Sequence, residues 1–503
     1  MSSRVSDSPI RGCCGCATAS FSRRDLLTVG TVAAFAPAAV ATPGNRRQPV
    51  SVPLKVQPVL TYDIPKKREG TSYRRWGGLL TEADVAAEKE RIGRELKALA
   101  AAKPAAGFLP LRAVRTPEEA AAAAAGSHDL TLIYAAGGGV KTLEALVQPQ
   151  RWNLMFLRHR SGPVSLWYEI AHPRMLRKTV DEFGQPGLSV HDVVVDSQPE
   201  VALRLRALHG LKNTLGKKIV AVGGPSGWGT GGKKAPEISR SVWKLDIQTV
   251  GYPELGERIQ RARADSARVK RCAADADRYL KQKGVSLETS RDFVNKAFLL
   301  TDVFRDLLDE AQTDAITINQ CMGTIMKVSE TTACLPLSVL NDEGYMAFCE
   351  SDFVVIPSGI LLHSISGRPV FLNDPTHPHD QLVTIAHCTA PRKMDGERLD
   401  PARILTHFES DWGAAPKVEM RKGQKVTNLI PDFGNRKWVG FEGEIADVPF
   451  LPICRSQADV AFRGDTEKLL EEMKGFHWMT CYGTYVREAR YALAKIGVGM
   501  TVV

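Results

Sequence analysis

Short apolar runs alternate with helical stretches through the first half of the chain. The clearest runs lie at 130–135, 152–158, 191–195 and 218–222, and the first and last of them lead into glycine-rich loops. Short, largely apolar runs of this length are typical of strands buried on both faces, as in a parallel sheet. Their alternation with helices predicts an α/β fold with parallel, Rossmann-like domains in the N-terminal part of the chain.

The same reading places the other elements and a change of pattern near residue 370. Helices are expected at 81–102, 116–125, 252–283, 290–311, 333–340 and 485–494, and further strands at 246–250, 315–318 and 345–349. From 370 onward, short strands with frequent Gly and Pro turns predict a C-terminal β-barrel-like domain. Residues 42–75 show little periodicity, so we expect an extended arm there.

These patterns divide the 503 residues into five segments. The expected segments are a signal peptide (1–41), an N-terminal arm with helices (42–125), a first α/β domain (126–232), a second α/β domain that carries carboxylate metal ligands (233–368) and a β-rich domain (369–503). A chain of this length is too long for a single small module.

The first segment has the features of a twin-arginine signal. Arg23 and Arg24 precede an apolar stretch at 26–40, which ends in small residues before Thr42. The stretch is shorter than the ~20 residues that a membrane span needs. We therefore expect export to the periplasm, or a cytoplasmic protein if the signal is not used, with no stable membrane insertion after processing.

Composition narrows the class of protein. The chain is 44% hydrophobic and 24% charged, which is ordinary for a folded protein and excludes collagen-like and disordered chains. Its 66 basic and 56 acidic residues give a net charge of +10, spread without a long basic run. We therefore expect no nucleic-acid partner. The ten cysteines form no CxxC pair outside the signal, so most are expected to be buried small side chains.

Two carboxylates stand out at the end of the predicted strand 345–349. Glu350 and Asp352 are two positions apart and therefore lie on the same side of an extended chain. Carboxylates grouped in this way repel each other unless a cation or protons neutralise them, which favours a hard divalent metal such as Mn²⁺ or Mg²⁺. The alternative is that Glu350 caps the following helix and Asp352 is solvated.

Two histidines complement these carboxylates. His387 ends an apolar strand and His477 lies between aromatic residues, where a histidine is more often a satisfied core residue than a ligand. The glycine-rich run 223–232 lacks the spacing of a P-loop, a dinucleotide site or a nucleophile elbow, so we expect it to line a cleft. The residues alone thus predict an α/β protein with a candidate carboxylate metal site.

Several motifs occur in an order that resembles a known superfamily. They are Glu330 before an apolar helix, Leu340-Asn341-Asp342, Cys349-Glu350-Ser351-Asp352, Ser366-Gly367-Arg368-Pro369-Val370, Ala386-His387-Cys388-Thr389, Pro225-Ser226-Gly227-Trp228 and Gly475-Phe476-His477-Trp478. Together they resemble the L-fucose isomerase and L-arabinose isomerase superfamily over about 125–490. Export and the basic N-terminal arm depart from that resemblance, because such isomerases are generally cytoplasmic.

The resemblance implies a metal set and a reaction. Glu330, Asp352 and His477 would bind a catalytic Mn²⁺, with Mg²⁺ or Co²⁺ as alternatives, and Glu330 and Asp352 would also move the substrate protons. Glu350, His387 and Trp228 would bind the substrate. The implied activity is that of an intramolecular oxidoreductase, a ketol isomerase that interconverts aldose and ketose through an enediol.

The resemblance also implies partners. The substrate would be a small sugar similar to L-fucose or L-arabinose, and the chain would form a homotrimer or homohexamer. Two other classes of function stay open at this point: a noncatalytic carbohydrate-binding protein with the same cleft, and a metal-dependent lyase or hydrolase acting on acidic glycans.

Overall fold

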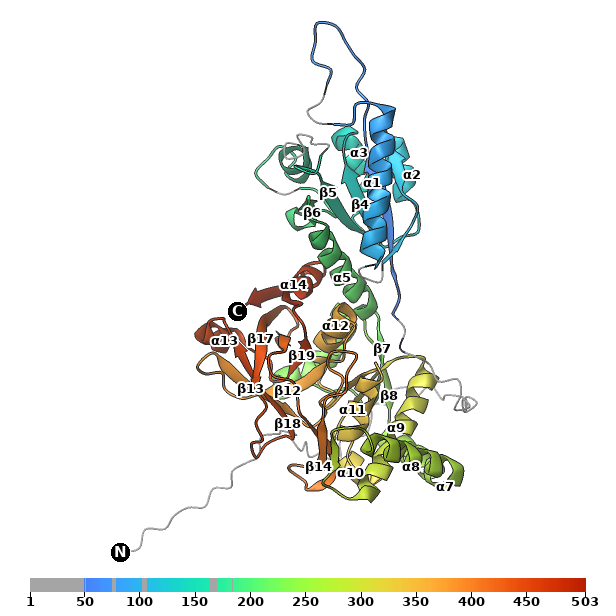
Figure 1. Ribbon diagram of the computed structural model, residues 1–503, viewed down its shortest axis with the longest axis vertical. Coiled ribbons are helices and arrows are strands. Elements are labelled where there is room, and N and C mark those ends of the chain that lie inside the picture. The colour runs from blue at the N-terminus through green and yellow to red at the C-terminus, as the bar shows by residue number, and fades with distance from the viewer. Residues whose placement is uncertain (1–48, 50, 75–77, 102–105, 163–169, 183) are drawn as a thin grey trace, which may run out of the picture. The chain divides into compact units, whose positions relative to one another are not determined.

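The computed structural model describes residues 49, 51–74, 78–101, 106–162, 170–182 and 184–503 (Figure 1). The predicted twin-arginine signal at 1–41 lies outside these residues. The described chain forms two compact units, Ser51–Lys212 and Asn213–Val503. Among the described residues, no helix is both long and apolar enough to cross a membrane.

The smaller unit is built on a parallel sheet with the order β2-β1-β4-β5-β6, in which β3 also pairs with β1. Its strands are β1 (Leu54–Thr61), β2 (Ala106–Phe108), β3 (Arg112–Val114), β4 (Leu130–Ala135), β5 (Trp152–Leu157) and β6 (Val193–Val195). Its helices are α1 (Glu82–Ala101), α2 (Pro117–Ala124), α3 (Gly139–Leu146) and α5 (Gln198–Thr214), with a π-helix at Ile170–Leu176 and a 3₁₀ turn at Val190–Asp192.

The prediction of an extended arm at 42–75 is wrong for Leu54–Thr61, because these residues form β1 inside this sheet. All of its residues except Lys55 are buried. Gln57 and Pro58 break the apolar run in the sequence, yet the Gln57 amide donates hydrogen bonds to the carbonyls of Pro58 (3.0 Å) and Pro110 (2.9 Å). A satisfied amide costs little to bury, so a polar residue can occupy a central strand.

The larger unit contains a second parallel sheet, of order β11-β10-β7-β8, and a small sheet of order β15-β14-β9. These strands are β7 (Lys218–Val222), β8 (Asp246–Val250), β9 (Val285–Leu287), β10 (Ala315–Ile318), β11 (Met346–Phe348), β14 (Ala402–His407) and β15 (Trp412–Val418). The expected domain boundary at 232 is therefore misplaced: β7 pairs with β8 and β10, and the units divide at 212.

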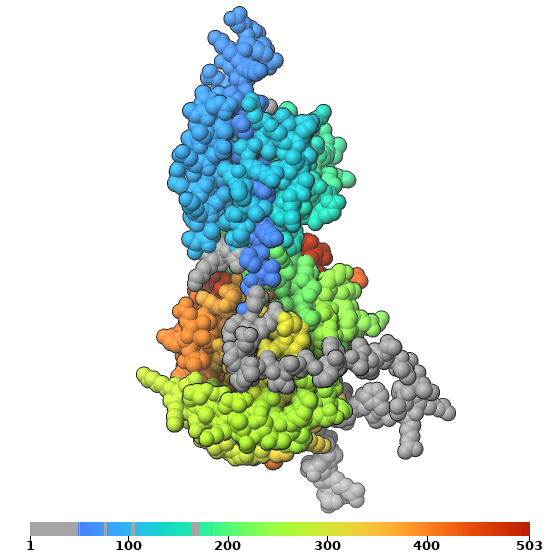
Figure 2. All heavy atoms as spheres, turned by 90° about the vertical axis from the view of Figure 1, so that its right-hand side faces the viewer, coloured from blue at the N-terminus to red at the C-terminus, as the bar shows by residue number. Residues whose placement is uncertain are grey.

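Helices pack on this second sheet and on the barrel that follows. They are α6 (Ala235–Val242), α7 (Tyr252–Ala264), α8 (Ser266–Leu280), α9 (Arg291–Ala311), α10 (Thr324–Ser329), α11 (Cys334–Asp342), α12 (Ile356–Ser366), α13 (Thr466–Glu472) and α14 (Val486–Ala494), with a 3₁₀ turn at Gly231–Lys234. The single helix expected at 252–283 is two helices, because Asp265 leaves the helical conformation and caps α8 by accepting from the Arg268 N–H. Figure 2 shows α7 and α8, in lime green, on the outer surface of this unit.

The C-terminal region is a closed barrel, as predicted. Six antiparallel strands pair in the ring β16-β19-β12-β13-β18-β17, which closes because β16 also pairs with β17. They are β12 (Phe371–Pro375), β13 (Leu382–His387), β16 (Lys425–Ile430), β17 (Lys437–Asp447), β18 (Ser456–Phe462) and β19 (Trp478–Tyr482), and β20 (Gly499–Val502) adds to β17 in parallel. The fold is thus α/β with parallel sheets followed by a β-barrel (Figure 1).

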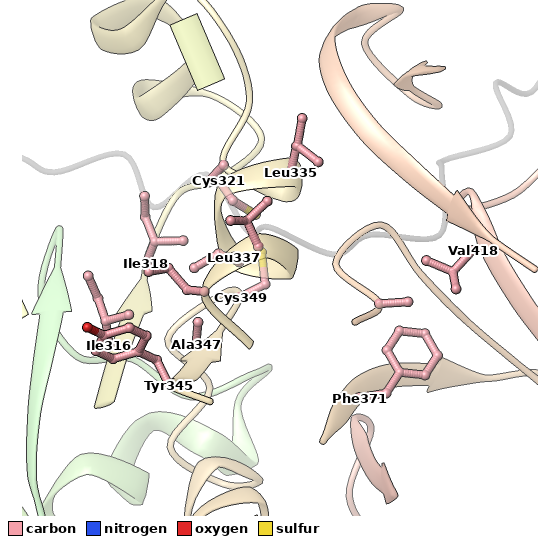
Figure 3. Close-up of a cluster of buried hydrophobic side chains, with 14 of the residues drawn as sticks. Ile316, Ile318, Cys321, Leu335, Leu337, Tyr345, Ala347, Cys349, Phe371 and Val418 are labelled. Atoms are coloured by element: carbon pink, nitrogen blue, oxygen red, sulfur yellow. The ribbon is translucent and has the colours of Figure 1, made fainter. Parts of the chain in front are cut away.

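One apolar core runs from the second sheet into the barrel. Ile316 and Ile318 of β10 and Leu337 of α11 belong to the same buried cluster as Phe371 of β12 (Figure 3). This core holds the carboxyl end of β11 next to the barrel. The two predicted carboxylates follow directly after that strand.

Candidate metal site

A strained turn presents Glu350 to the barrel. Glu350 and Ser351 have φ values of 64° and 49°, in the left-handed region that side chains other than glycine rarely adopt. The Ser351 N–H donates to the Thr317 hydroxyl (3.1 Å), and Ser226 pairs with Asp352 as an isolated parallel bridge. These contacts hold the turn after β11 in a conformation that an unsupported chain would leave.

The barrel supplies three further side chains from neighbouring strands. Asp374 lies in β12, His387 ends β13 and His477 directly precedes β19. Strand β12 is paired with both of the others, with Asp374 opposite Ala386 and Asn373 opposite Trp478. The register therefore brings the three residues to the same part of the barrel, although Asp374 and His477 are 103 positions apart in the sequence.

The Glu350 carboxylate lies between the two imidazoles. Its Oε2 is 3.3 Å from His477 Nε2 and its Oε1 is 3.5 Å from His387 Nε2. Asp374 Oδ1 approaches His477 Nε2 from another direction at 3.2 Å. One donor atom from each of Glu350, His387 and His477 lies within 4.8 Å of the other two. We call Glu350, Asp374, His387 and His477 the central cluster.

Asp352 fixes the orientation of His477. Its Oδ2 is 2.7 Å from His477 Nδ1, while its Oδ1 accepts the backbone N–H groups of Trp228 (3.0 Å) and Val354 (3.1 Å). An ionised carboxylate only accepts hydrogen bonds, so His477 Nδ1 carries a proton and Nε2 faces the cluster. A carboxylate behind an imidazole is the usual support of a metal-binding histidine.

The cluster is buried, and its charges act on one another. Burial lowers the pKa of His477, but the Glu350 charge and the contacts with Asp352 and Asp374 outweigh this and raise it well above its ordinary value. For His387 too, Glu350 and Asp374 overcome burial and raise the pKa. Burial raises the pKa of Glu350, but the two histidines lower it further than burial raises it. The protein alone thus forms a buried carboxylate–imidazolium cluster.

The donor set fits a divalent cation. Three buried atoms, His387 Nε2, His477 Nε2 and Asp374 Oδ1, make ion-pair contacts of 3.2–3.5 Å but no well-aligned hydrogen bond among the described residues. Buried polar atoms are usually hydrogen-bonded, and these three converge with the Glu350 carboxylate. Carboxylate and imidazole are the donors that Mn²⁺, Co²⁺ and related ions accept. Glu350, Asp374, His387 and His477 would hold such an ion.

Three of the predicted site residues lie in positions that differ from their expected roles. Glu350 and His387, expected to bind substrate, lie in the centre. Asp352, expected to bind the metal, has both oxygens engaged by His477 and by two backbone N–H groups. It therefore acts on the site through His477. His477 lies among the candidate donor atoms, and its role as a metal ligand stays a prediction.

Glu330 is not brought to this cluster, so the predicted ligand set needs correction. It follows α10 with a φ of 56°, and its side chain is 47% exposed. Its carboxylate pairs with Arg263 (2.6 Å) and Lys296 (3.0 Å) on α7 and α9. Contact with Lys296 is the largest influence on Glu330 and, with Arg263, lowers its pKa. A carboxylate engaged by two fixed cations on the surface is not available to a buried ion.

Trp228 lies at the border of the site. Its indole ring is half-buried and stacks on Phe476 with centroids 4.0 Å apart and planes at 12°. The glycine-rich loop that carries it is closely packed, since a Cβ on Gly227 would lie 2.1 Å from the Gly232 carbonyl oxygen. Only glycine fits there. The loop follows β7, at the carboxyl end of the sheet where a cleft was expected.

Sequence reasoning missed Asp374. It precedes Pro375 in a stretch with two further histidines and a second proline, which has the composition of a surface turn. His377 and His379 are indeed exposed. The signal for Asp374 is that it directly follows the buried run Phe371–Asn373 of β12 and therefore lies at the end of a core strand.

Glu350 also faces a pair of thiols. Its carboxylate and the sulfurs of Cys321 and Cys349 lie within 4.8 Å of one another. The Cys321 thiol is the strongest influence on Cys349 and lowers its pKa, but burial and the Glu350 charge together raise that pKa to about 12. These two thiols are described further below.

Comparison with known protein families and with characterised proteins finds no significant match to this chain. The isomerase resemblance therefore rests on the short sequence motifs alone.

Proposed function

We propose that this protein is a divalent-metal-dependent ketol isomerase of the L-fucose and L-arabinose isomerase type. The observation that carries the proposal is the central cluster, in which two imidazoles and two carboxylates converge, and three of their buried atoms make ion-pair contacts but no well-aligned hydrogen bond. A plain sugar-binding cleft has no need of such a set. Mn²⁺ is the expected ion, with Mg²⁺ and Co²⁺ as alternatives.

A bound ion would supply a Lewis acid that polarises neighbouring oxygens of the sugar. The residues then divide the remaining work by position. Glu350 is held between two imidazoles, and Asp352 keeps His477 Nε2 directed at Glu350 and Asp374. Their role is to hold the ion in one place.

Asp374 is the group best placed to move the proton. Its side chain is 17% exposed, against 12% for Glu350 and 1% for His477, so it is the cluster member that a substrate reaches first. Its carboxylate would take the proton from C2 of the aldose and return it to C1 of the enediol, while the hydroxyl proton of O2 passes to O1. A carboxylate that stays within hydrogen-bond reach of both carbons is sufficient for this transfer.

Two aromatic rings support a sugar as substrate. Trp228 stacks on Phe476, which directly precedes His477 in the chain. The half-buried indole offers an apolar face beside the polar cluster, and small-molecule sites commonly combine such walls with a few placed polar groups. The homotrimer or homohexamer and the export to the periplasm stay predictions, the first from the resemblance and the second from the N-terminal sequence.

The test is metal content and turnover on the same samples. The purified chain would be compared with the Glu350→Gln variant. Glu330→Gln is the matched control, because Glu330 also has a left-handed backbone conformation. We expect about one Mn²⁺ per chain and aldose-to-ketose conversion of at least one sugar in a small panel. Both are expected to be lost in Glu350→Gln and kept in Glu330→Gln. Bound metal without conversion of any aldose would overturn the isomerase proposal and favour a noncatalytic sugar-binding protein.

A further inference from the structure

Two cysteines that are distant in the sequence meet beside Glu350. Strands β10 and β11 are parallel neighbours, with Thr317 opposite Phe348, so Cys349 follows β11 at the level where β10 ends. The chain after β10 passes through Gln320, at a φ of 52°, and turns Cys321 back toward that point. The sulfurs of Cys321 and Cys349 lie within 4.8 Å of each other.

Apart from the Glu350 carboxylate, the surroundings of this pair are apolar. Cys321 is 9% exposed and Cys349 2%, and both belong to the main hydrophobic core. Figure 3 shows them near Ile318, Leu335 and Leu337. A disulfide is neutral and apolar, so such a setting accommodates it. Cys321 lies in a turn outside the strands, which lets its sulfur approach Cys349 without disturbing β10 or β11.

We propose that Cys321 and Cys349 are a modification site that forms a disulfide under oxidising conditions. In the reaction two S–H bonds break and one S–S bond of about 2 Å forms. The two electrons and two protons pass by thiol–disulfide exchange to a small-molecule disulfide, which is reduced to two thiols. Disulfides form and persist in oxidising compartments outside the cytoplasm, where the predicted signal would send the chain.

The disulfide is expected to act on the central cluster. Cys349 directly precedes Glu350, and the Glu350 carboxylate lies within 4.8 Å of both sulfurs. Closing the sulfur gap pulls on the strained turn that presents Glu350 between the two histidines. Oxidation would therefore weaken metal binding. This part rests on the proposed function, whereas formation of the disulfide does not.

A second group of thiols is the natural competitor. Cys334, Cys388 and Cys454 pack together around Ala415. The Arg455 N–H also donates to the Cys388 sulfur at 3.5 Å. A disulfide within this group is a different outcome, so the test must map the linkage and not only count thiols.

The mapping experiment uses the full chain, purified in reductant and then exposed to glutathione disulfide. Free thiols are alkylated, the protein is digested without reduction, and peptides are identified by mass spectrometry. We expect a peptide containing Cys321 linked to one containing Cys349, which dithiothreitol separates. Alkylation of both cysteines after oxidation, or linkage only among Cys334, Cys388 and Cys454, would overturn the proposal.

The effect on the site is read from Mn²⁺ affinity before and after oxidation. We expect a loss of about tenfold, comparable to the loss of a supporting contact around a metal site. The loss should be absent in Cys321→Ala and present in Cys481→Ala, which removes a different buried cysteine. Unchanged affinity in oxidised wild type would contradict the coupling. If neither state binds Mn²⁺, the proposed function fails while the mapped linkage still decides the modification site.

Discussion

Glu330 and Glu350 lie in two regions of the larger unit. The backbone conformation is the same at both glutamates, but the cationic side chains that pair with them differ. Both glutamates have a left-handed backbone, with φ values of 56° and 64°. The side chain of Glu330 is 47% exposed and pairs with Arg263 and Lys296. That of Glu350 is 12% exposed and lies between His387 and His477.

The difference in cations decides what each region can do. Arginine and lysine keep their protons and present no lone pair to a metal, so the pairing at Glu330 is fixed. Imidazole can give up a proton and then becomes a ligand, so the pairing at Glu350 can be exchanged for a metal ion. A glutamate is therefore a ligand candidate because of the groups around it, and the local sequence pattern does not decide the matter.

The largest effect should come from removing the imidazole that faces both carboxylates. His477→Gln is expected to lower Mn²⁺ affinity by more than about 100-fold, since it removes a donor and the group that Asp352 orients. It also leaves Glu350 and Asp374 buried without that partner, which should destabilise the metal-free protein by about 3 kcal/mol. Calorimetric metal titration and thermal unfolding measure the two effects.

His377→Gln is the matched control, because His377 is exposed on the turn after β12. It should leave affinity and stability unchanged. Metal binding that survives in His477→Gln would break the contrast between the two glutamate regions, because Glu350 would then not depend on its histidines.

Asp352→Asn tests orientation without removing a donor. The amide oxygen can still accept from the N–H groups of Trp228 and Val354, but its NH₂ group faces His477 Nδ1 in place of a carboxylate oxygen. We expect the imidazole to lose its preferred tautomer and Mn²⁺ affinity to fall by about 10- to 100-fold. An unchanged titration curve, with an unchanged melting temperature, would show that His477 needs no support from Asp352.

Asp342 shows what burial does to a carboxylate when no cation partner outweighs it. Burial raises its pKa to about 7, more than the Lys393 N–H and the charge of Arg392 lower it. The folded state therefore keeps a proton that the unfolded state releases above about pH 4. The free energy of unfolding therefore falls as the pH rises from about 4 to about 7. Above pH 7 the full cost of ionising the buried Asp342 carboxyl is present.

Asp342→Asn should remove this penalty, since Oδ1 can still accept the Lys393 N–H. We expect a gain in unfolding free energy on the order of 4 kcal/mol at pH 8 that disappears near pH 4. Denaturant unfolding at both pH values measures it. A gain that is equal at the two pH values would mean that ionisation of Asp342 is not its origin.

Sequence patterns predicted the sheets, most helices and the barrel because apolar periodicity follows burial directly. They missed β1, because Gln57 and Pro58 interrupt its apolar pattern in the sequence. The strand is nevertheless buried, since the Gln57 amide donates hydrogen bonds to backbone carbonyls. In the site, the pair Glu350 and Asp352 could be singled out by their position after an apolar run, and His477 by its place between aromatic residues. Their division of roles could not, because it depends on which carboxylate oxygen meets which imidazole nitrogen across separate strands.

Glu330→Gln should have the smallest effect of these changes, although the family resemblance gave Glu330 a catalytic role. Its two ion pairs are exposed, and such pairs contribute about 0.5 kcal/mol and are screened by salt. We expect Mn²⁺ affinity and isomerase turnover within about twofold of wild type, and a small loss of stability that shrinks as salt is added. Loss of bound metal in this variant would reverse the contrast: it would mean that the residues around Glu330 rearrange to bring its carboxylate to the ion, and that the exposed ion pairs belong to a state without metal.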